Sequence, residues 1–256
     1  MQRLRDPKTG CPWDIAQNYE TIAPSTLEEA YEVVDAIEKK DFAHLKEELG
    51  DLLFQVIFYS QLGDEEQRFN FNDVVSTLVA KLVRRHPHVF PDGTLQSKID
   101  NRDSLSADVK ARWEAIKQEE RAAKGAQGVL DDVPLNLPAL SRAAKLQKRA
   151  ASVGFDWDNV QGPIAKISEE LEEVEQELRE KNLAGVEEEL GDLFFAVVNV
   201  SRFLKIDPEQ ALRKANLKFS QRFEYIEKNL GKPFSSSNID ELNQLWNKAK
   251  LQREKG

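Results

Sequence analysis

Residues 27–56 read LEEAYEVVDAIEKKDFAHLKEELGDLLFQV, and residues 168–197 read SEELEEVEQELREKNLAGVEEELGDLFFAV. The second stretch lies 141 positions after the first and repeats its acidic residues in register. Each copy contains E-E-x-x-E followed by E-x-x-D, and the last carboxylate runs into an apolar segment. The repeated acids are Glu28, Glu29, Glu32, Glu48 and Asp51 in the first copy, and Glu169, Glu170, Glu173, Glu189 and Asp192 in the second. This duplication predicts two tandem domains, each with a group of carboxylates on two helices.

The carboxylates have two explanations, a solvated helix face and a metal site. A single E-E-x-x-E run favours the first, because glutamate is a good helix former and such runs are usually solvated. The second pair is more informative, since Glu189 and Asp192 share one helix face and lead into the apolar run at 193–198. Buried carboxylates need a partner. A salt bridge could serve, but four acids placed alike in both halves favour a divalent cation.

The available ligand types narrow the choice of metal. The chain has three histidines, His44, His86 and His88, and none of them has a glutamate three residues before it. The Glu-x-x-His pairs that di-iron bundles use are therefore missing. Ligands that are all oxygen point to Mg²⁺ or Mn²⁺ rather than to iron or zinc. A divalent ion held in this way serves phosphate chemistry.

The composition limits the class of function. The 256 residues suffice for two domains, and the formal net charge is −9 with a sequence pI of about 5.1. No duplex nucleic acid is expected as a partner, because that requires a basic face, whereas a small phosphorylated ligand fits if a metal screens it. Cys11 is the only cysteine, so a reducing, cytoplasmic compartment is expected. Residues 1–14 lack the apolar core of a signal peptide, and no membrane span is expected.

Helix signals dominate both halves, so the predicted class is all-α with two tandem four-helix domains, at 1–124 and 139–256, joined by a linker at 125–138. In the first half, helices are predicted from a capping box at Ser25 and Glu28 to about Lys40, after Asp41, from near Asn72 to before Pro87, and at roughly 105–123. In the second half, they are predicted at about 163–181, at 183–204, from Asp207-Pro208-Glu209 until Gly231, and after a cap by Asn238 and Glu241.

Basic and aromatic residues are duplicated as well. Lys81, Arg85, Trp113 and Lys117 of the first half correspond, at a slightly different shift, to Lys218, Arg222, Trp246 and Lys250 of the second. A nucleotide requires such a set, because cations bind its phosphate oxygens and a flat apolar surface accepts its base. Taken singly, each cation is better explained as a surface charge, and each tryptophan as part of a core.

The sequence resembles the MazG-type nucleoside triphosphate pyrophosphohydrolases over essentially its whole length. The segments that carry the resemblance are GCPWD at 10–14, TLEEAYEVVDAI at 26–37, EELGDLLFQV at 47–56, RRHPHVF at 84–90, VGFDW at 153–157 and EEELGDLFFAVVN at 187–199. The carboxylate signature belongs to the wider all-α NTP pyrophosphatase superfamily. The flanking segments narrow the resemblance to the MazG type.

The resemblance implies that nucleoside triphosphates are hydrolysed to the monophosphate and pyrophosphate, with Mg²⁺, by a helical homodimer. Phe54, Ile57 and Phe58 are then expected to form an apolar face that the second copy covers. The implied metal ligands are Glu170, Glu173, Glu189 and Asp192, with Glu29, Glu32, Glu48 and Asp51 as a secondary N-terminal set. The implied nucleotide contacts are Lys166, Glu169, Glu170, Glu188, Lys218, Arg222, Trp246 and Lys250.

In the expected mechanism, water attacks the α-phosphorus and pyrophosphate leaves. Glu169 is the candidate base, and Lys218 and Arg222 stabilise charge on the leaving group. The chain has no Walker A motif, which excludes P-loop chemistry. The second half is expected to carry most of the activity, because its Lys166 corresponds to Ser25, and a serine cannot supply positive charge to a phosphate.

A second hypothesis comes from a different class, a regulatory or interaction protein whose repeat binds nucleotide without turnover. Loss of ligands in both halves would favour it, and neither half has lost any. A mixed arrangement, in which one half catalyses and the other binds nucleotide or dimerises, also agrees with the sequence. For the enzyme, the expected role is house-cleaning or control of the nucleotide pool.

Overall fold

The computed structural model describes residues 1–97, 112–113, 116–117, 119–120, 125 and 128–253. It divides into two compact units, Met1–Glu119 and Glu120–Gly256. Every regular element in the described residues is a helix, which confirms the all-α class. None of these helices combines the length and the apolarity needed to cross a membrane.

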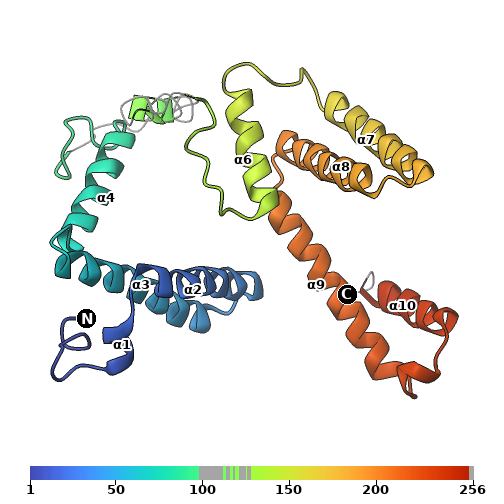
Figure 1. The fold of residues 1–256 in the computed structure, drawn as a ribbon, viewed down its shortest axis with the longest axis horizontal. Coiled ribbons are helices and arrows are strands. Elements are labelled where there is room, and N and C mark those ends of the chain that lie inside the picture. Colours follow the sequence, from blue (N-terminus) through green and yellow to red (C-terminus); the bar gives the residue numbers. More distant parts are fainter. Residues whose placement is uncertain (98–111, 114–115, 118, 121–124, 126–127, 254–256) are drawn as a thin grey trace. The chain divides into compact units, whose positions relative to one another are not determined.

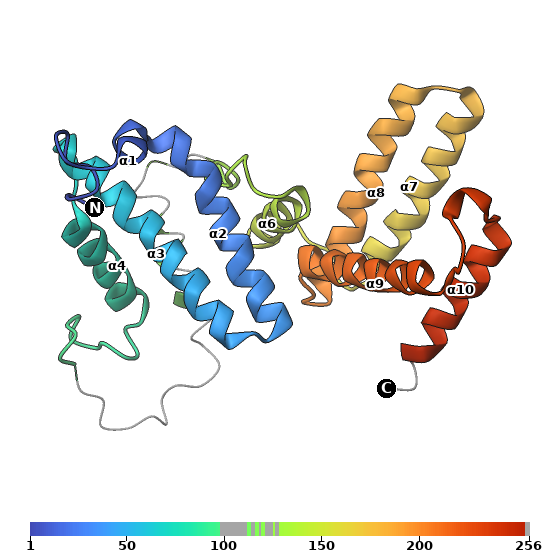
Figure 2. The same cartoon turned by 90° about the horizontal axis from the view of Figure 1, so that it is seen from below.

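The first unit is built around an antiparallel helical hairpin. Its elements are α1 (Pro12–Ala16), α2 (Tyr19–Lys39), α3 (Phe42–Glu65) and α4 (Phe71–Arg85). The α2 and α3 helices lie side by side, and α4 packs against α3 (Figure 2). Ile22, Phe58 and Leu62 form the buried core between α2 and α3. Phe58 was predicted to lie on an exposed apolar face, but it is fully buried within its own chain, so that prediction is wrong.

The start of α2 also differs from the prediction. The helix begins at Tyr19, and its capping box joins Asn18 and Thr21, with Asn18 Oδ1 accepting from Thr21 N at 2.9 Å and Thr21 Oγ1 accepting from Asn18 N at 2.9 Å. Ser25 therefore lies inside the helix, directly after Pro24. The reciprocal cap satisfies two backbone groups, whereas Pro24 removes only one hydrogen-bond donor near the first turns. Most of the helix predicted at 105–123 lies outside the described residues.

The second unit contains a similar hairpin and further helices. Its elements are α6 (Ala139–Ala151), α7 (Gln161–Glu180), α8 (Leu183–Phe203), α9 (Pro208–Asn229), the short 3₁₀ helix η1 (Phe234–Ser236) and α10 (Ile239–Arg253). The α7 and α8 helices pair, α6 packs against α8 and α9, and α10 packs on α9 (Figure 1). The caps predicted at Asp207 and at Asn238 with Glu241 are confirmed. The α6 helix was not predicted.

The duplication extends to the turn of each hairpin. Lys40 ends α2 and Lys181 ends α7, and both adopt the left-handed conformation with φ 58°. The next residue caps the following helix in each case, because Asp41 accepts from His44 N and Asn182 accepts from Gly185 N. A turn of the same conformation therefore sets the angle at which the two acidic helices of each unit meet.

The core of the first unit is testable by truncation. Phe58→Ala should lower the free energy of unfolding by about 3–5 kcal/mol, because the change leaves a cavity in a fully buried site. The matched control is Phe42→Ala, whose side chain is 74% exposed and should change it by less than about 0.5 kcal/mol. Urea denaturation of the full chain measures both. Equal losses of unfolding free energy in the two variants would contradict the burial of Phe58 in the core of the first unit.

Candidate metal and nucleotide site

The second unit gathers three of its predicted acids. Glu170 and Glu173 project from α7 and Glu189 from α8, and each offers a carboxylate oxygen within 4.8 Å of the others. Asp192 lies outside this group, but its charge helps to raise the pKa of Glu189. The hairpin creates this cluster because the acids lie on facing sides of two antiparallel helices that pair along their lengths. Three oxygen ligands held in this way suit a hard divalent cation.

The electrostatics of the cluster agree with a site that needs positive charge. The pKa of Glu173 and that of Glu189 are both raised, chiefly because burial removes water from the carboxylates and further because neighbouring carboxylates repel their charge. Glu170 is the most buried member, with 5% of its surface exposed. A charge so buried requires compensation.

Lys166 supplies that compensation. Its Nζ lies 2.5 Å from Glu170 Oε1 and 3.0 Å from Glu169 Oε1, one turn away along α7. These two carboxylates raise the pKa of Lys166, so it stays charged. Lys166 and Glu169 thus lie at the edge of the carboxylate cluster. Glu188 is exposed on α8 next to Glu189.

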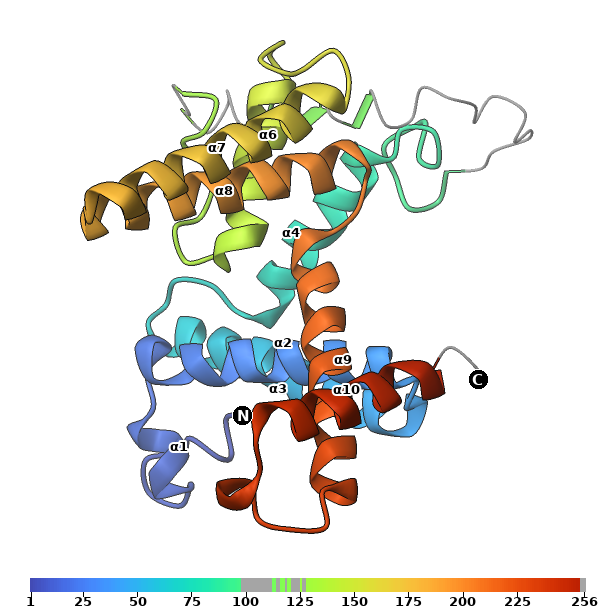
Figure 3. The same cartoon turned by 90° about the vertical axis from the view of Figure 1, so that its right-hand side faces the viewer.

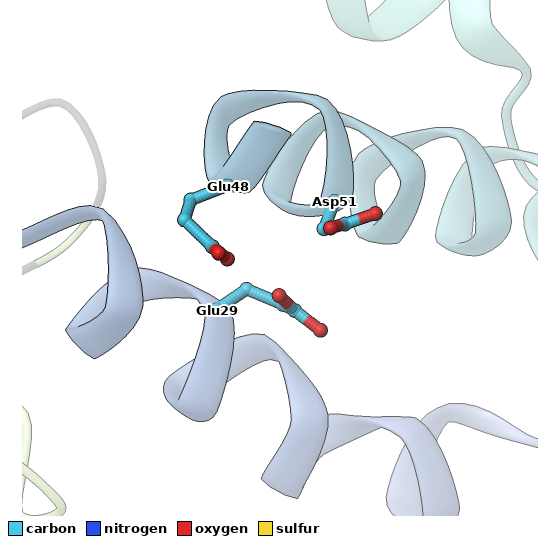
Figure 4. Close-up of side chains that lie close together, drawn as sticks. All are labelled: Glu29, Glu48 and Asp51. Carbon is cyan, nitrogen blue, oxygen red and sulfur yellow. The ribbon is translucent and has the colours of Figure 1, made fainter. Parts of the chain in front are cut away.

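The first unit repeats the cluster with one member exchanged. Glu29 of α2 and Glu48 and Asp51 of α3 bring carboxylate oxygens within 4.8 Å of one another, and Figure 4 shows them converging between the two helices. Glu32 lies outside this group but contributes to the raised pKa of Glu48. Each of the four predicted positions therefore belongs to the group in at least one unit.

The internal cation differs between the units. In the first unit, His44 Nε2 lies 2.5 Å from Glu48 Oε1, within α3. The residue that corresponds to His44 in the second unit is Gly185, and the residue that corresponds to Lys166 in the first is Ser25. The lysine of the second unit carries a permanent charge on a flexible stem, whereas the imidazole of His44 is charged only when protonated.

The basic and aromatic set forms a separate group on α9 and α10. The guanidinium of Arg222 lies 5.3 Å from the centre of the Trp246 ring, and its buried Nε has no hydrogen-bond partner. In the first unit, Arg85 lies 6.0 Å from the ring of Trp113. The predicted correspondence of these pairs is therefore seen in three dimensions. Lys218 and Lys250 are exposed.

This set is not joined to the carboxylates within one chain. The α9 helix leaves the end of α8 and carries α10 at its far end (Figures 1 and 3). Among the described residues, no hydrogen bond or ion pair connects Lys218, Arg222 or Trp246 with the acids of α7 and α8. The structure brings three of the four predicted metal ligands together with Lys166, but not the whole predicted nucleotide site.

Sequence reasoning missed a cavity between α6 and α8. Its volume is about 490 Å³, and its lining includes Gln147, Trp157, Phe195 and Asn199. The available signal was the aromatic segment VGFDW at 153–157, which forms one wall. Gln147 carried no signal, because α6 itself was not predicted.

Comparisons with known proteins agree with this architecture. A family model described as the MazG nucleotide pyrophosphohydrolase domain matches residues 17–90 and again residues 159–226. The nucleoside triphosphate pyrophosphohydrolase of Escherichia coli K12 is 49% identical over 98% of this chain and 95% of its own length. The nucleoside triphosphate pyrophosphohydrolase/pyrophosphatase MazG of Thermotoga maritima is 43% identical over 98% of this chain and 92% of its own length. The two matched segments contain both carboxylate hairpins, and the chain therefore belongs to the MazG nucleotide pyrophosphohydrolase family.

Proposed function

We propose that this protein hydrolyses nucleoside triphosphates to nucleoside monophosphates and pyrophosphate with the aid of Mg²⁺ or Mn²⁺. The observation that carries the proposal is the cluster of Glu170, Glu173 and Glu189, whose oxygens lie within 4.8 Å of one another beside the charged Lys166. The names of the relatives support the reaction. The single cysteine supports a cytoplasmic setting, in which the enzyme would control the nucleotide pool.

In the proposed mechanism, Glu170, Glu173 and Glu189 would hold the divalent ion, and Asp192 lies one turn along α8 from Glu189. When bound, such an ion neutralises phosphate oxygens and lowers the pKa of water. Glu169 is exposed, and its ion-pair partner within the part of the chain that the structure describes is Lys166, so its carboxylate can take a proton from the attacking water. The water oxygen bonds to the α-phosphorus as the bond to the bridging oxygen breaks. Pyrophosphate carries that oxygen away.

Lys166 has a second role in this proposal. Its ammonium forms an ion pair with Glu170. A divalent ion held by the carboxylates would compensate their charge, and Lys166 could then bind an anionic phosphate. The first unit has no lysine at this position, because Ser25 stands there. We therefore assign most of the turnover to the second unit and nucleotide binding or dimerisation to the first.

Product analysis separates this enzyme from a nucleotide sensor. Each nucleoside triphosphate is incubated with the protein and Mg²⁺, and the products are separated by chromatography. Monophosphate with pyrophosphate supports the proposal. Diphosphate with phosphate would mean attack at a different phosphorus, and retention of intact nucleotide would favour a binding protein.

A homodimer is part of the proposal. Phe194 on α8 is 60% exposed and Phe219 on α9 is 58% exposed, and such aromatic surface is normally covered. A second copy would cover it and could also bring Lys218 and Arg222 to carboxylates that they do not contact within their own chain. This argument replaces the one based on Phe58.

Paired substitutions test which unit is active. Glu173→Gln should lower kcat at least about a hundredfold, because loss of a metal ligand costs no less than loss of its supporting contacts. Glu32→Gln, the corresponding change in the first unit, should leave most of the turnover. Steady-state kinetics with saturating Mg²⁺ measures both variants. The assignment is reversed if Glu32→Gln abolishes turnover and Glu173→Gln does not.

The carboxylates should couple stability to pH and metal. Folding raises the pKa of Glu173 and Glu189 above the ordinary value of 4.5, so the folded state holds their protons longer than the unfolded state. Without metal, the protonated carboxyls of Glu173 and Glu189 stabilise the folded state below pH 4.5. This stabilisation should be lost as the pH rises through their raised pKa values. Mg²⁺ at a hundredfold excess over its dissociation constant should then add about 2.7 kcal/mol. Calcium should also stabilise the fold but support little turnover.

Thermal melts across pH, with and without Mg²⁺, measure this coupling. Glu189→Gln removes one repelling charge and one ligand, so its melting temperature should depend less on pH and rise less with Mg²⁺. A melting temperature that ignores millimolar Mg²⁺, together with full activity in a chelator, would identify these acids as an ordinary solvated face.

The dimer is tested by sedimentation. At micromolar concentration, the protein should sediment at twice its chain mass of 29.2 kDa. Phe194→Asp should weaken the assembly, because a carboxylate cannot be buried there without a partner. A wild-type protein that sediments as a single 29.2 kDa species would contradict the proposed homodimer.

A further inference from the structure

The carboxylate cluster of the first unit differs from that of the second in the side chains that border it. Glu29, Glu48 and Asp51 bring carboxylate oxygens within 4.8 Å of one another between α2 and α3 (Figure 4). Burial raises the pKa of Glu29, and the charges of Asp51, Glu32 and Glu48 raise it further. A neighbouring amide and a neighbouring imidazole add donors that the cluster of the second unit does not have.

The amide belongs to Gln55. This residue of α3 is 6% exposed, and its Oε1 is buried without a hydrogen-bond partner among the described residues. Native proteins rarely leave a buried acceptor in this state, and a bound ion or water satisfies it where they do. The equivalent residue of the second unit is Ala196, so only the first unit has an amide at this position.

The register of the hairpin places Gln55 beside the carboxylates. The hydroxyls of Thr26 on α2 and Tyr59 on α3 form a hydrogen bond of 2.7 Å, which fixes how the two helices pair. Because the helices run antiparallel, Glu29 and Gln55 both lie one turn from this contact and face each other. Gln55 also follows Asp51 by four residues, so the two side chains share one face of α3. The unpaired oxygen therefore borders the acidic cluster on its core side.

His44 brings a nitrogen donor to the other end of the cluster. Its Nε2 lies 2.5 Å from an oxygen of Glu48, four residues further along α3. That spacing lets two side chains of one helix reach the same ion, as paired histidines do in zinc metalloproteases. The side chain of His44 is 43% exposed, so it can turn toward an ion without disturbing the core. The second unit has Gly185 at this position, and residues 120–256 contain no histidine.

A nitrogen donor changes the preference of a site among divalent ions. Mg²⁺ takes oxygen ligands in a nearly ideal octahedron and gives up its water reluctantly. Imidazole suits zinc and other first-row transition metals, whose affinity for mixed nitrogen and oxygen sites rises from Mn²⁺ to Co²⁺. Ser25 stands where the second unit has Lys166, so the lysine that pairs with Glu170 has no counterpart at the first cluster. The two copies of the hairpin are thus built for different ions.

We propose that the first unit holds a first-row transition-metal ion, Mn²⁺, Co²⁺ or Zn²⁺, with His44 Nε2 as its nitrogen ligand. Glu29, Glu48 and Asp51 supply charged oxygens, and Gln55 Oε1 supplies a neutral one. The cluster of the second unit offers oxygen alone and suits Mg²⁺. The inference concerns α2 and α3 and does not rest on the proposed hydrolysis.

Pulsed electron paramagnetic resonance of bound Mn²⁺ detects a nitrogen ligand directly. Mn²⁺ is added to the metal-free full chain, and the modulation from a coordinated imidazole nitrogen is recorded. An ion on the second unit gives no such signal, because that unit has no histidine. The wild type should show the nitrogen coupling, and His44→Asn should lose it. The matched control is His86→Asn, at the end of α4, which should keep it.

Nitrogen coupling that is missing in the wild type, or that persists in His44→Asn, would overturn the proposal. Loss of the coupling in His86→Asn alone would assign the ion to the neighbouring rings of His86 and His88, and would overturn it as well. Each of these results is independent of turnover, which the separation of nucleotide products tests by itself.

Competition between ions tests the metal preference. Excess Mg²⁺ should remove Mn²⁺ from the second unit and leave the nitrogen-coupled signal of the first. Zn²⁺ should then remove that signal, because an imidazole site binds Zn²⁺ more tightly than Mn²⁺. If Mg²⁺ displaces the nitrogen-coupled Mn²⁺ as readily as the rest, the preference for a transition metal is contradicted.

Dialysis against Co²⁺ in excess Mg²⁺ tests the ligand set. His44→Asn and Gln55→Ala should each lower the affinity for Co²⁺ at least about tenfold, because even supporting contacts of a metal site have effects of this size. Gln61→Ala, which removes an amide of α3 bonded to Glu65, should leave the affinity unchanged. Equal affinities of Gln55→Ala and the wild type would contradict the role of Gln55. His44→Asn changes an exposed side chain, so it tests the site even if Gln55→Ala fails to fold.

Discussion

Repulsion between carboxylates held on two paired helices is the constraint on which this structure depends. At 4 Å, two unit charges repel by about 4 kcal/mol at an effective dielectric of 20. Apolar packing along the α2–α3 and α7–α8 hairpins must hold the acids together against this repulsion. One basic side chain in each unit lies against an acid of the cluster, His44 in the first unit and the charged Lys166 in the second. The remaining negative charge is the basis of the affinity for a divalent ion that we propose for each cluster.

The two units preserve the scaffold and differ in the compensating charge. Lys40 and Lys181 adopt the same left-handed turn, and both hairpins gather three of four equivalent acids. The basic side chain beside the acids lies on α3, the second helix of its hairpin, in the first unit. It lies on α7, the first helix of its hairpin, in the second unit. A duplicated site can diverge in this way without a change of fold. The turn that joins the two helices and the apolar faces that pack them do not depend on which helix carries the basic side chain.

The second unit distributes nucleotide chemistry over separate elements. Carboxylates and Lys166 lie on α7 and α8, a cavity with aromatic walls lies between α6 and α8, and the cations with Trp246 lie on α9 and α10. Among the described residues, no hydrogen bond or ion pair joins the α9–α10 group to the acids, and a second copy of the chain is the proposed source of its contribution.

The sequence by itself determined the helical class, the tandem repeat, the acidic positions and the helix starts at Asp41, Asp207 and Asn238. These follow from local periodicity and residue chemistry. Only the tertiary structure decided that Phe58 is buried, that Glu170 pairs with Lys166, and that Gln147 faces a cavity with an unsatisfied oxygen. Burial and pairing depend on which helices pack together, and no local pattern records the neighbours that a side chain meets when the chain folds.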